Sequence, residues 1–527
     1  SKMRDNLIAF AEQARLSRIL VELKRDAPLP EPLDDFLLKE VPEPPLRAFL
    51  EHHGFASLLK RLGGDGPNRP DHQTMKLIKS EARVAPQSPA PGPMPFDRGS
   101  YACVQTVEAL ESWIEEARRA GVIAVDTETD ALDSMRAGLV GVSVAVAPNR
   151  ACYIPLGHGG TDLLSETPQQ IPFDTAVGLI KPLLEDPSVL KVGHNIKYDM
   201  NVLARYGIAV GPIDDTMVMS FDLDAGRHNH GMDELALEHL GHSCISFKDV
   251  CGSGKSQLTF NQVPLKEATR YAAEDADVTL RFWHWMRPRL SAERVTRVYE
   301  RVDRPLIPVL AAMEREGIKV DRDELARMSK EFADGIAGLE TEIHALAGQP
   351  FTVGSPKQLG DILFGKMGLK GGRKGKSGDY STDVTVLEKL ASDGVVIAGK
   401  VLEWRQLAKL KSTYTDSLQE QVNPKTGRVH TSYSITGAQT GRLSSNDPNL
   451  QNIPVRTEIG RRIREAFVAE PGNVLLSADY SQIELRLAAH MADVPALKEA
   501  FAKGQDIHAL TAMELFGEVN RDTRGRA

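Results

Sequence analysis

Acidic residues follow directly on an apolar run in the segment VIAVDTETD. Val122 to Val125 suit a buried strand, and Asp126, Glu128 and Asp130 stand at its end. Side chains two positions apart on an extended strand point to the same side, so Asp126 and Glu128 share one face. The acids are either a solvated turn or a group of like charges that bound cations hold together.

Two later segments carry acids in positions that fit such a cation site. Asp199 begins a helix after the strand-like VLKVGHN, and Tyr271 and Asp275 lie four residues apart on a long helix that starts after Pro264. Four carboxylates in one pocket repel one another unless cations bind, and oxygen ligands alone suit Mg²⁺ or Mn²⁺. Together they favour a two-metal hydrolytic site, in which one ion generates hydroxide and the other stabilises the leaving oxygen.

A further acid stands in LLSADYSQIELR. We predict a strand over NVLLSADYS that leads to Asp479, followed by a helix that carries Glu484. Taken alone, this aspartate is explained equally well as a structural residue, so its surroundings must decide.

The segment GKMGLKGGRKGKSG is basic and rich in glycine. It holds five cations with no acid between them: Lys366, Lys370, Arg373, Lys374 and Lys376. A solubilising loop explains such a run, but glycines also let the backbone approach phosphate, and the charges would release counterions from DNA. We favour contact with DNA.

Two kinds of pattern resemble known binding sites but do not match them. CGSGKS and GRKGKS lack the first glycine of a phosphate-binding loop. Neither the His242, Cys244 and Cys251 group nor the pair His228 and His230 has the spacing of a zinc site, and we interpret them as packing or surface residues.

Composition describes an ordinary globular protein of several domains. The chain has 527 residues, 41% hydrophobic and 26% charged, with a formal net charge of -8. That charge does not indicate a nucleic-acid binder, so such a role must come from local basic patches. Four cysteines, no signal-peptide pattern and no apolar run near the ~18 residues of a membrane span predict a cytoplasmic protein without membrane contact.

Strands and helices must position these groups. Strand-like and helical segments alternate from residue 101 to 290, helical periodicity dominates after that, and strands return near the end. Residues 64–100, rich in Pro, Gly, Ser and Ala, indicate a linker.

Three segments resemble the exonuclease motifs of the bacterial DNA polymerase I family (family A). They are DTE after a strand, HNIKYD and YAAED, and the likeness continues through QLTFNQ. The resemblance implies a ribonuclease H-like fold, 3′→5′ hydrolysis of DNA and two Mg²⁺ or Mn²⁺ ions per active site. The residues that would hold the metals are Asp126, Glu128, Asp199 and Asp275.

The same resemblance implies roles in positioning the substrate. Tyr271 would orient the attacking water, and Leu132 and Phe247 would wedge the frayed terminal bases, with Asn195 nearby.

TGRLSSNDPNLQNIPVR and DYSQIELR resemble the polymerase part of that family. By this likeness Asp479 binds both catalytic metals, and Glu484 excludes a 2′-hydroxyl from beneath the incoming sugar. Donors in the minor groove can check base-pair geometry without reading sequence. The residues expected to touch the primer-template are Arg442, Asn449, Gln451 and Asn452, and those expected to contact the deoxynucleoside triphosphate are His508 and Arg524.

The expected fold is α/β: a ribonuclease H-like 3′-5′ exonuclease domain followed by a partial right-hand polymerase domain. The predicted segments are a helical remnant of a 5′ nuclease domain (1–63), a linker (64–100), the exonuclease domain (101–290), the thumb and first part of the polymerase (291–425), and a partial palm with the start of the fingers (426–527). In this family the basic segment belongs to the thumb.

The chain opens SKMRDN and stops at RDTRGRA, before the family's remaining fingers residues and its second palm carboxylate. We expect a piece of a longer, monomeric proofreading DNA polymerase, with a complete exonuclease site and an incomplete polymerase site. A stand-alone exonuclease would not need TGRLSS or DYSQIELR, and a non-catalytic DNA-binding module would not need four matching acids.

Overall fold

The computed structural model of the chain describes residues 94–159, 167–373, 378–455 and 458–520, together with residues 44, 46, 47 and 50. The chain divides into two units, Ser1–Pro89 and Ala90–Ala527. Apart from those four residues, the segment 1–63 with its predicted helices lies outside the described residues, as does most of the predicted linker. The second unit is described below.

A mixed sheet forms the centre of the α/β region, which we define as residues 94–292. Its strand order is β1-β4-β3-β2-β5-β6; β2 pairs antiparallel with β3 and parallel with β5. The strands are β1 (Ala102–Cys103), β2 (Val122–Thr129), β3 (Leu139–Ala147), β4 (Arg150–Pro155), β5 (Leu190–Gly193) and β6 (Ile213–Asp215).

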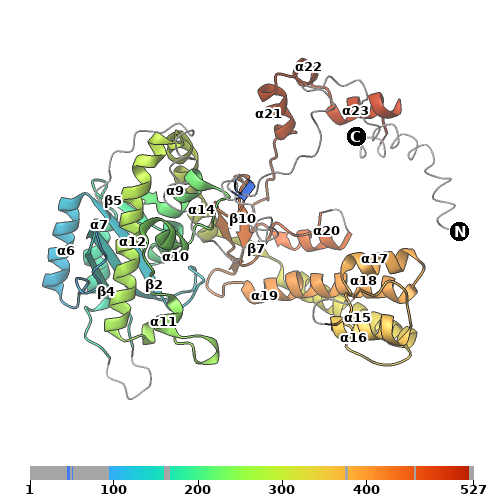
Figure 1. Ribbon diagram of the computed structural model, residues 1–527, viewed down its shortest axis with the longest axis horizontal. Helices are drawn as coiled ribbons and strands as arrows, with labels where there is room; N and C mark the ends of the chain where they lie inside the picture. Colours follow the sequence, from blue (N-terminus) through green and yellow to red (C-terminus); the bar gives the residue numbers. More distant parts are fainter. Residues whose placement is uncertain are drawn as a thin grey trace. The chain divides into compact units, whose positions relative to one another are not determined.

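Helices cover both faces of this sheet (Figure 1). One face packs against α6 (Val107–Ala120) and α7 (Phe173–Leu184), and α12 (Leu265–Ala292) crosses the other. The smaller helices of the region are α8 (Ile196–Ala204), α9 (Thr216–Asp224), α10 (Met232–Leu235), η2 (Ala236–Leu240), α11 (Phe247–Cys251), η3 (Gly254–Ser256) and η4 (Phe260–Gln262).

Strand β2 alternates between these two faces. Ile123 and Val125 join the core under α6 and α7, whereas Ala124 packs against Ala273 and Ala276 of α12. Small side chains on this face let α12 lie close to the sheet. Asp126 and Glu128 have the parity of Ala124, so they turn toward α12.

The C-terminal region, residues 296–516, is mainly helical. Its first part is α13 (Thr296–Val298), η5 (Tyr299–Asp303), α14 (Arg304–Glu316), α15 (Arg322–Ala347), α16 (Pro356–Gly360), η6 (Asp361–Lys366), α17 (Val384–Ser392), α18 (Val396–Leu410), η7 (Lys411–Asp416) and α19 (Ser417–Gln421). The region also holds two small sheets, in the orders β11-β7-β8 and β10-β9, and β7 lies between α14 and α15 in the chain. Their strands are β7 (Ile318–Val320), β8 (Arg428–Val429), β9 (Ser432–Ser434), β10 (Ser444–Asn446) and β11 (Phe467–Val468). Four helices complete the region: α20 (Glu458–Glu465), α21 (Ile483–Met491), α22 (Pro495–Ala502) and α23 (Ile507–Phe516).

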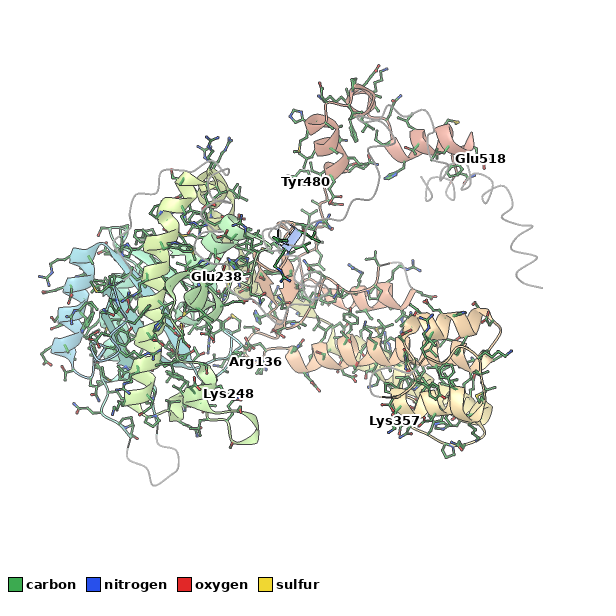
Figure 2. All side chains as sticks on the ribbon, viewed as in Figure 1. Arg136, Glu238, Lys248, Lys357, Tyr480 and Glu518 are labelled. Carbon is green, nitrogen blue, oxygen red and sulfur yellow. The ribbon has the colours of Figure 1, made fainter. Side chains whose placement is uncertain are left out.

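The predicted strand over NVLLSADYS is wrong. Residues 473–480 form no strand, and Val474 and Leu476 are 85% and 90% exposed. A strand is stable only when a neighbour accepts and donates its backbone hydrogen bonds, and no strand among the described residues pairs with this segment. Figure 2 labels Tyr480 at the end of the segment, just before α21.

Among the described residues, no helix is both long enough and apolar enough to cross a membrane.

Candidate active site

Three of the four acids predicted to share a pocket meet between β2 and α12. One carboxylate oxygen from each of Asp126, Glu128 and Asp275 lies within 4.8 Å of the other two. The Tyr271 hydroxyl donates a hydrogen bond to Asp275 one helical turn away. The i, i+4 spacing on α12 therefore places a phenol beside the carboxylate cluster, as the sequence predicts.

The fourth acid, Asp199, joins the site through β2. It is buried in the first turn of α8, and its Oδ1 accepts hydrogen bonds from Thr127 N (2.9 Å) and Thr127 Oγ1 (2.5 Å). Burial is the largest cause that raises the pKa of Asp199, and the nearby carboxylate of Asp126 raises it further. Sequence reasoning missed Thr127; the signal was its place between the two acids, which turns it to the opposite face of β2.

The cluster is electrostatically strained without a cation. Burial raises the pKa of Asp126 to about 7. Burial, and then the neighbouring acids, raise the pKa of Glu128 well above its ordinary value, and the same two causes act on Asp275. Glu128 Oε1 is buried and has no hydrogen-bond partner. An unpartnered buried oxygen among repelling carboxylates fits a divalent cation that prefers oxygen ligands.

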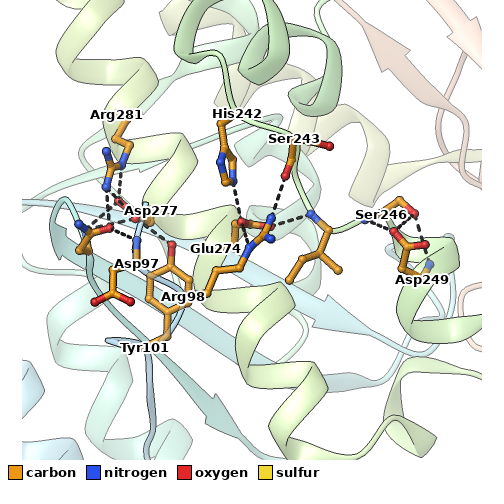
Figure 3. Close-up of polar contacts among 12 residues, drawn as sticks. Asp97, Arg98, Tyr101, His242, Ser243, Ser246, Asp249, Glu274, Asp277 and Arg281 are labelled. Atoms are coloured by element: carbon orange, nitrogen blue, oxygen red, sulfur yellow. Dashed lines mark hydrogen bonds and ion pairs between the residues drawn. The ribbon is translucent and has the colours of Figure 1, made fainter. Parts of the chain in front are cut away.

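Buried polar contacts fix α12, which carries Asp275. Glu274 is fully buried and accepts hydrogen bonds from Arg98 Nε (2.6 Å), His242 Nε2 (2.7 Å) and Ile245 N (2.7 Å) (Figure 3). Arg98 belongs to the predicted linker, so the end of that linker contacts α12 through this hydrogen bond. Sequence reasoning missed Glu274, because in a charged helix it cannot be told from a solvated acid.

A second set of contacts on α12 lies one turn further along the helix. Asp277 accepts hydrogen bonds from Tyr101 OH (2.9 Å) and Arg281 Nε (2.9 Å), and Arg281 also lies over the ring of Phe96. Together the two sets hold the helix in register over the sheet.

The residues predicted to bind the substrate near this site lie at the surface. Leu132 is 95% exposed, and Phe247 is exposed with its ring 6.4 Å from that of Tyr271. Leu132 and Asn195 line the same groove, and Asn195 precedes α8 with a positive φ of 67°. None of the four acids lines this groove, so the structure places Leu132 and Asn195 together but not in one pocket with the acid cluster.

The second predicted site is the one around Asp479, and its residues are less closely assembled than the acid cluster. Asp479 is exposed, and no metal-binding group of acids and histidines found among the described residues includes it. Arg442 forms an ion pair with Glu484, with both side chains largely exposed. His508 lies in the first turn of α23, and Arg524 lies outside the described residues.

The three amide residues of the second site shape their own loop. Asn449 Oδ1 accepts hydrogen bonds from Gln451 N (3.0 Å) and Asn452 N (3.3 Å), and Gln451 Nε2 donates to Leu443 O (2.9 Å). They close the turn that follows β10.

Two family models match separate parts of the chain. Residues 101–291 match the family model described as 3′-5′ exonuclease, and residues 322–527 match DNA polymerase family A. DNA polymerase I of Rhizobium leguminosarum is 47% identical over 98% of this chain and 57% of its own length. That of Pseudomonas aeruginosa is 47% identical over 81% of this chain and 46% of its own.

A solved structure agrees with these relatives. The POL domain of Pol1 from M. smegmatis, in complex with DNA primer-template and dNTP, has a TM-score of 0.63 and 30% sequence identity, over 81% of this chain and 69% of that one. The chain belongs to DNA polymerase family A. The fold of this family A chain is therefore an exonuclease domain joined to a polymerase domain, as the sequence predicts. The chain spans about half the length of the curated relatives it matches.

Proposed function

We propose that this chain hydrolyses DNA from single-stranded 3′ ends, as the proofreading part of a DNA-directed DNA polymerase that acts in replication and repair. The observation that carries the proposal is the buried acid cluster with an unpartnered Glu128 Oε1. A solvated turn would leave these acids exposed, with ordinary pKa values.

We propose Asp126, Glu128, Asp199 and Asp275 as ligands of two Mg²⁺ or Mn²⁺ ions. When bound, the ions would supply the charge that activates water and stabilises the leaving oxygen. Thr127 would keep Asp199 in place. Metal identity and number are part of the proposal.

The remaining side chains around the cluster would position the DNA. Burial raises the pKa of the Tyr271 phenol, which keeps its proton on the hydroxyl that donates to Asp275. Its oxygen would then orient the attacking water by accepting a hydrogen bond from it. Exposed Leu132 and the Phe247 ring would hold the terminal bases apart, with Asn195 beside them.

We also propose a DNA polymerase site in the protein to which this chain corresponds. The match of residues 322–527 to family A supports it, and the related M. smegmatis domain binds primer-template and dNTP. Asp479 would bind metal, and Glu484 would exclude the 2′-hydroxyl. The proposed DNA contacts are Arg442, Asn449, Gln451 and Asn452, and the proposed nucleotide contacts are His508 and Arg524. We expect a monomer in the cytoplasm.

Degradation of a 5′-labelled single strand tests the exonuclease proposal. We expect shortening in Mg²⁺, none after chelation, and a loss of about 10³-fold in Asp199→Ala, equivalent to roughly 4 kcal/mol of transition-state stabilisation. The matched control is Asp174→Ala, an exposed acid on α7, which should degrade DNA normally. Undiminished degradation by a folded Asp199→Ala protein would refute the assignment.

A further inference from the structure

Three side chains that the proposed function does not use meet where α9 ends. Asp224 is the last residue of α9, His228 lies in the turn that follows, and His239 lies on η2. One possible ligand atom of each lies within 4.8 Å of the other two. The sequence hides this group, because His239 is separated from the histidines of the turn by a short helix.

Both imidazoles present a free nitrogen. His228 Nδ1 lies 2.7 Å from Asn229 O, and because a carbonyl only accepts, Nδ1 carries the proton and Nε2 is left with a lone pair. His228 Nε2 and His239 Nε2 are both buried without a hydrogen-bond partner. Buried nitrogens in native proteins find a partner, and a histidine that binds metal commonly donates its other N–H to a backbone carbonyl.

The local charge permits a cation. Asp224 accepts from Arg227 Nη1 (2.8 Å) and Arg289 Nη2 (3.0 Å), one bond on each oxygen, which leaves a lone pair on each for a metal. Arg289 also pairs with Glu293, and Glu238, labelled in Figure 2, is close enough to His239 to raise its pKa against the larger effect of burial. Three acids and two arginines therefore surround the two imidazoles, which leaves an excess of negative charge.

One ligand is held firmly and another can adjust. The His239 ring stacks on Trp285 of α12 at 4.2 Å, and Arg289 covers the same indole. His228 lies in an exposed turn beside Gly226, whose φ is +80°. Tetrahedral coordination by zinc needs ligand atoms about 3.4 Å apart, so atoms that lie within 4.8 Å of one another must approach by no more than about 1.4 Å.

We propose that Asp224, His228 and His239 bind one Zn²⁺ ion, with water at the fourth position. Two imidazole nitrogens and one carboxylate oxygen suit zinc, whereas the all-oxygen exonuclease cluster suits Mg²⁺ or Mn²⁺. The ion would tie the turn after α9 to η2 and, through Trp285, to α12. Its role would be structural and separate from DNA hydrolysis.

The test must keep this site apart from the exonuclease acids. The background protein is therefore Asp126→Asn with Glu128→Gln, dialysed against Zn²⁺ and then metal-free buffer, with bound zinc measured by plasma mass spectrometry. We expect one equivalent per chain, lost in His228→Gln and in His239→Gln. His284→Gln is the matched control, since His284 is exposed on α12 beside Trp285 and should leave the equivalent in place.

Two outcomes overturn the site: no zinc retained by the background protein, or equal zinc in folded His228→Gln and His239→Gln variants. Zinc retained without these histidines would be bound elsewhere. Should either variant fail to fold, Co²⁺ absorption of the folded background protein decides. Visible bands of tetrahedral, nitrogen-bound cobalt support the proposal, and their absence refutes it.

Discussion

Buried carboxylates oppose folding until something neutralises them. Asp126, Glu128, Asp199 and Asp275 lie at the end of an apolar sheet, where Glu128 and Asp199 are buried and each acid has little contact with water and faces other acids. The domain offsets this with apolar burial on both faces of the sheet and with the Thr127 and Tyr271 hydrogen bonds. Such an arrangement stores repulsion that protonation or a bound cation relieves, which is typical of a functional site.

Burial of these carboxylates predicts a pH-dependent stability of the metal-free chain. The pKa of Asp126 rises from 3.8 when unfolded to about 7 when folded. Between those values the folded state holds a proton that the unfolded chain has released, so stability falls as pH rises through that window. Mn²⁺ binds the ionised, folded form and should restore stability.

Thermal unfolding with and without Mn²⁺ measures this effect. The rise in Tm on adding Mn²⁺ should be larger at about pH 8 than at about pH 5.5, and most of it should vanish in Asp126→Asn with Glu128→Gln. Equal shifts at both pH values would contradict the raised pKa values as the source of the coupling.

Glu484 gives a second prediction at the scale of the residue. Its carboxylate pairs with Arg442, which holds it near the loop expected to contact the primer. In the full-length polymerase, Glu484→Ala should raise ribonucleotide incorporation at least tenfold, because it opens space for a 2′-hydroxyl worth roughly 1.4 kcal/mol or more of discrimination. Primer extension with ribonucleotides measures it, and Glu499→Ala, an exposed acid on α22, is the control. Unchanged sugar discrimination would show that another group forms the gate.

At the scale of the element, α8 depends on a buried ion pair with α14. Lys197 pairs with Glu314, and both are buried. Glu314 also accepts hydrogen bonds from Asn201 Nδ2 (2.6 Å) and from Tyr433 N on β9 (2.6 Å). The helix that presents Asp199 is thus fixed by a residue more than a hundred positions later in the chain.

Removing Glu314 should therefore destabilise the protein strongly. Glu314→Ala leaves Lys197 buried and uncompensated, and we expect a loss of about 3–5 kcal/mol in the free energy of unfolding. Urea unfolding measures it. The control is Glu316→Ala, whose side chain is 76% exposed and should change stability by less than about 0.5 kcal/mol. Equal stability of the two variants would contradict a buried ion-pair role.

Elements with local signals were predictable from the sequence. The apolar run before Asp126 and the Pro264 start of α12 appear where expected, because alternation and helix periodicity are properties of short segments. The partners of Glu274, Lys197 and His239 were not predictable, since each depends on contacts between distant segments. The predicted strand before Asp479 is wrong for the same reason. Its sequence favours a strand, but a strand also needs a neighbouring strand to pair with.

At the scale of the whole molecule, the two proposed sites differ in what they require from the chain. The exonuclease acids lie between Asp126 and Asp275, within one sheet and the helices on it, and Glu314 of the next region braces them. Asp479 lies in an exposed segment without strand pairing, and no acid among the described residues joins it in a metal-binding group. Nucleotide transfer needs metal ions held by more than one carboxylate.

A protein made of these 527 residues alone should therefore shorten primers and not extend them. Incubation of a labelled primer-template with Mg²⁺ and all four deoxynucleotides measures both activities at once, because products shorter or longer than the primer separate on one gel. The Asp199→Ala variant is the control for trimming, since it should leave the primer at its starting length and reveal any weak extension that hydrolysis would hide. Extension by the Asp199→Ala protein, at the rate of a full-length family A polymerase and with the chain length verified by mass, would contradict the inference that Asp479 lacks the metal-binding partners that nucleotide transfer needs.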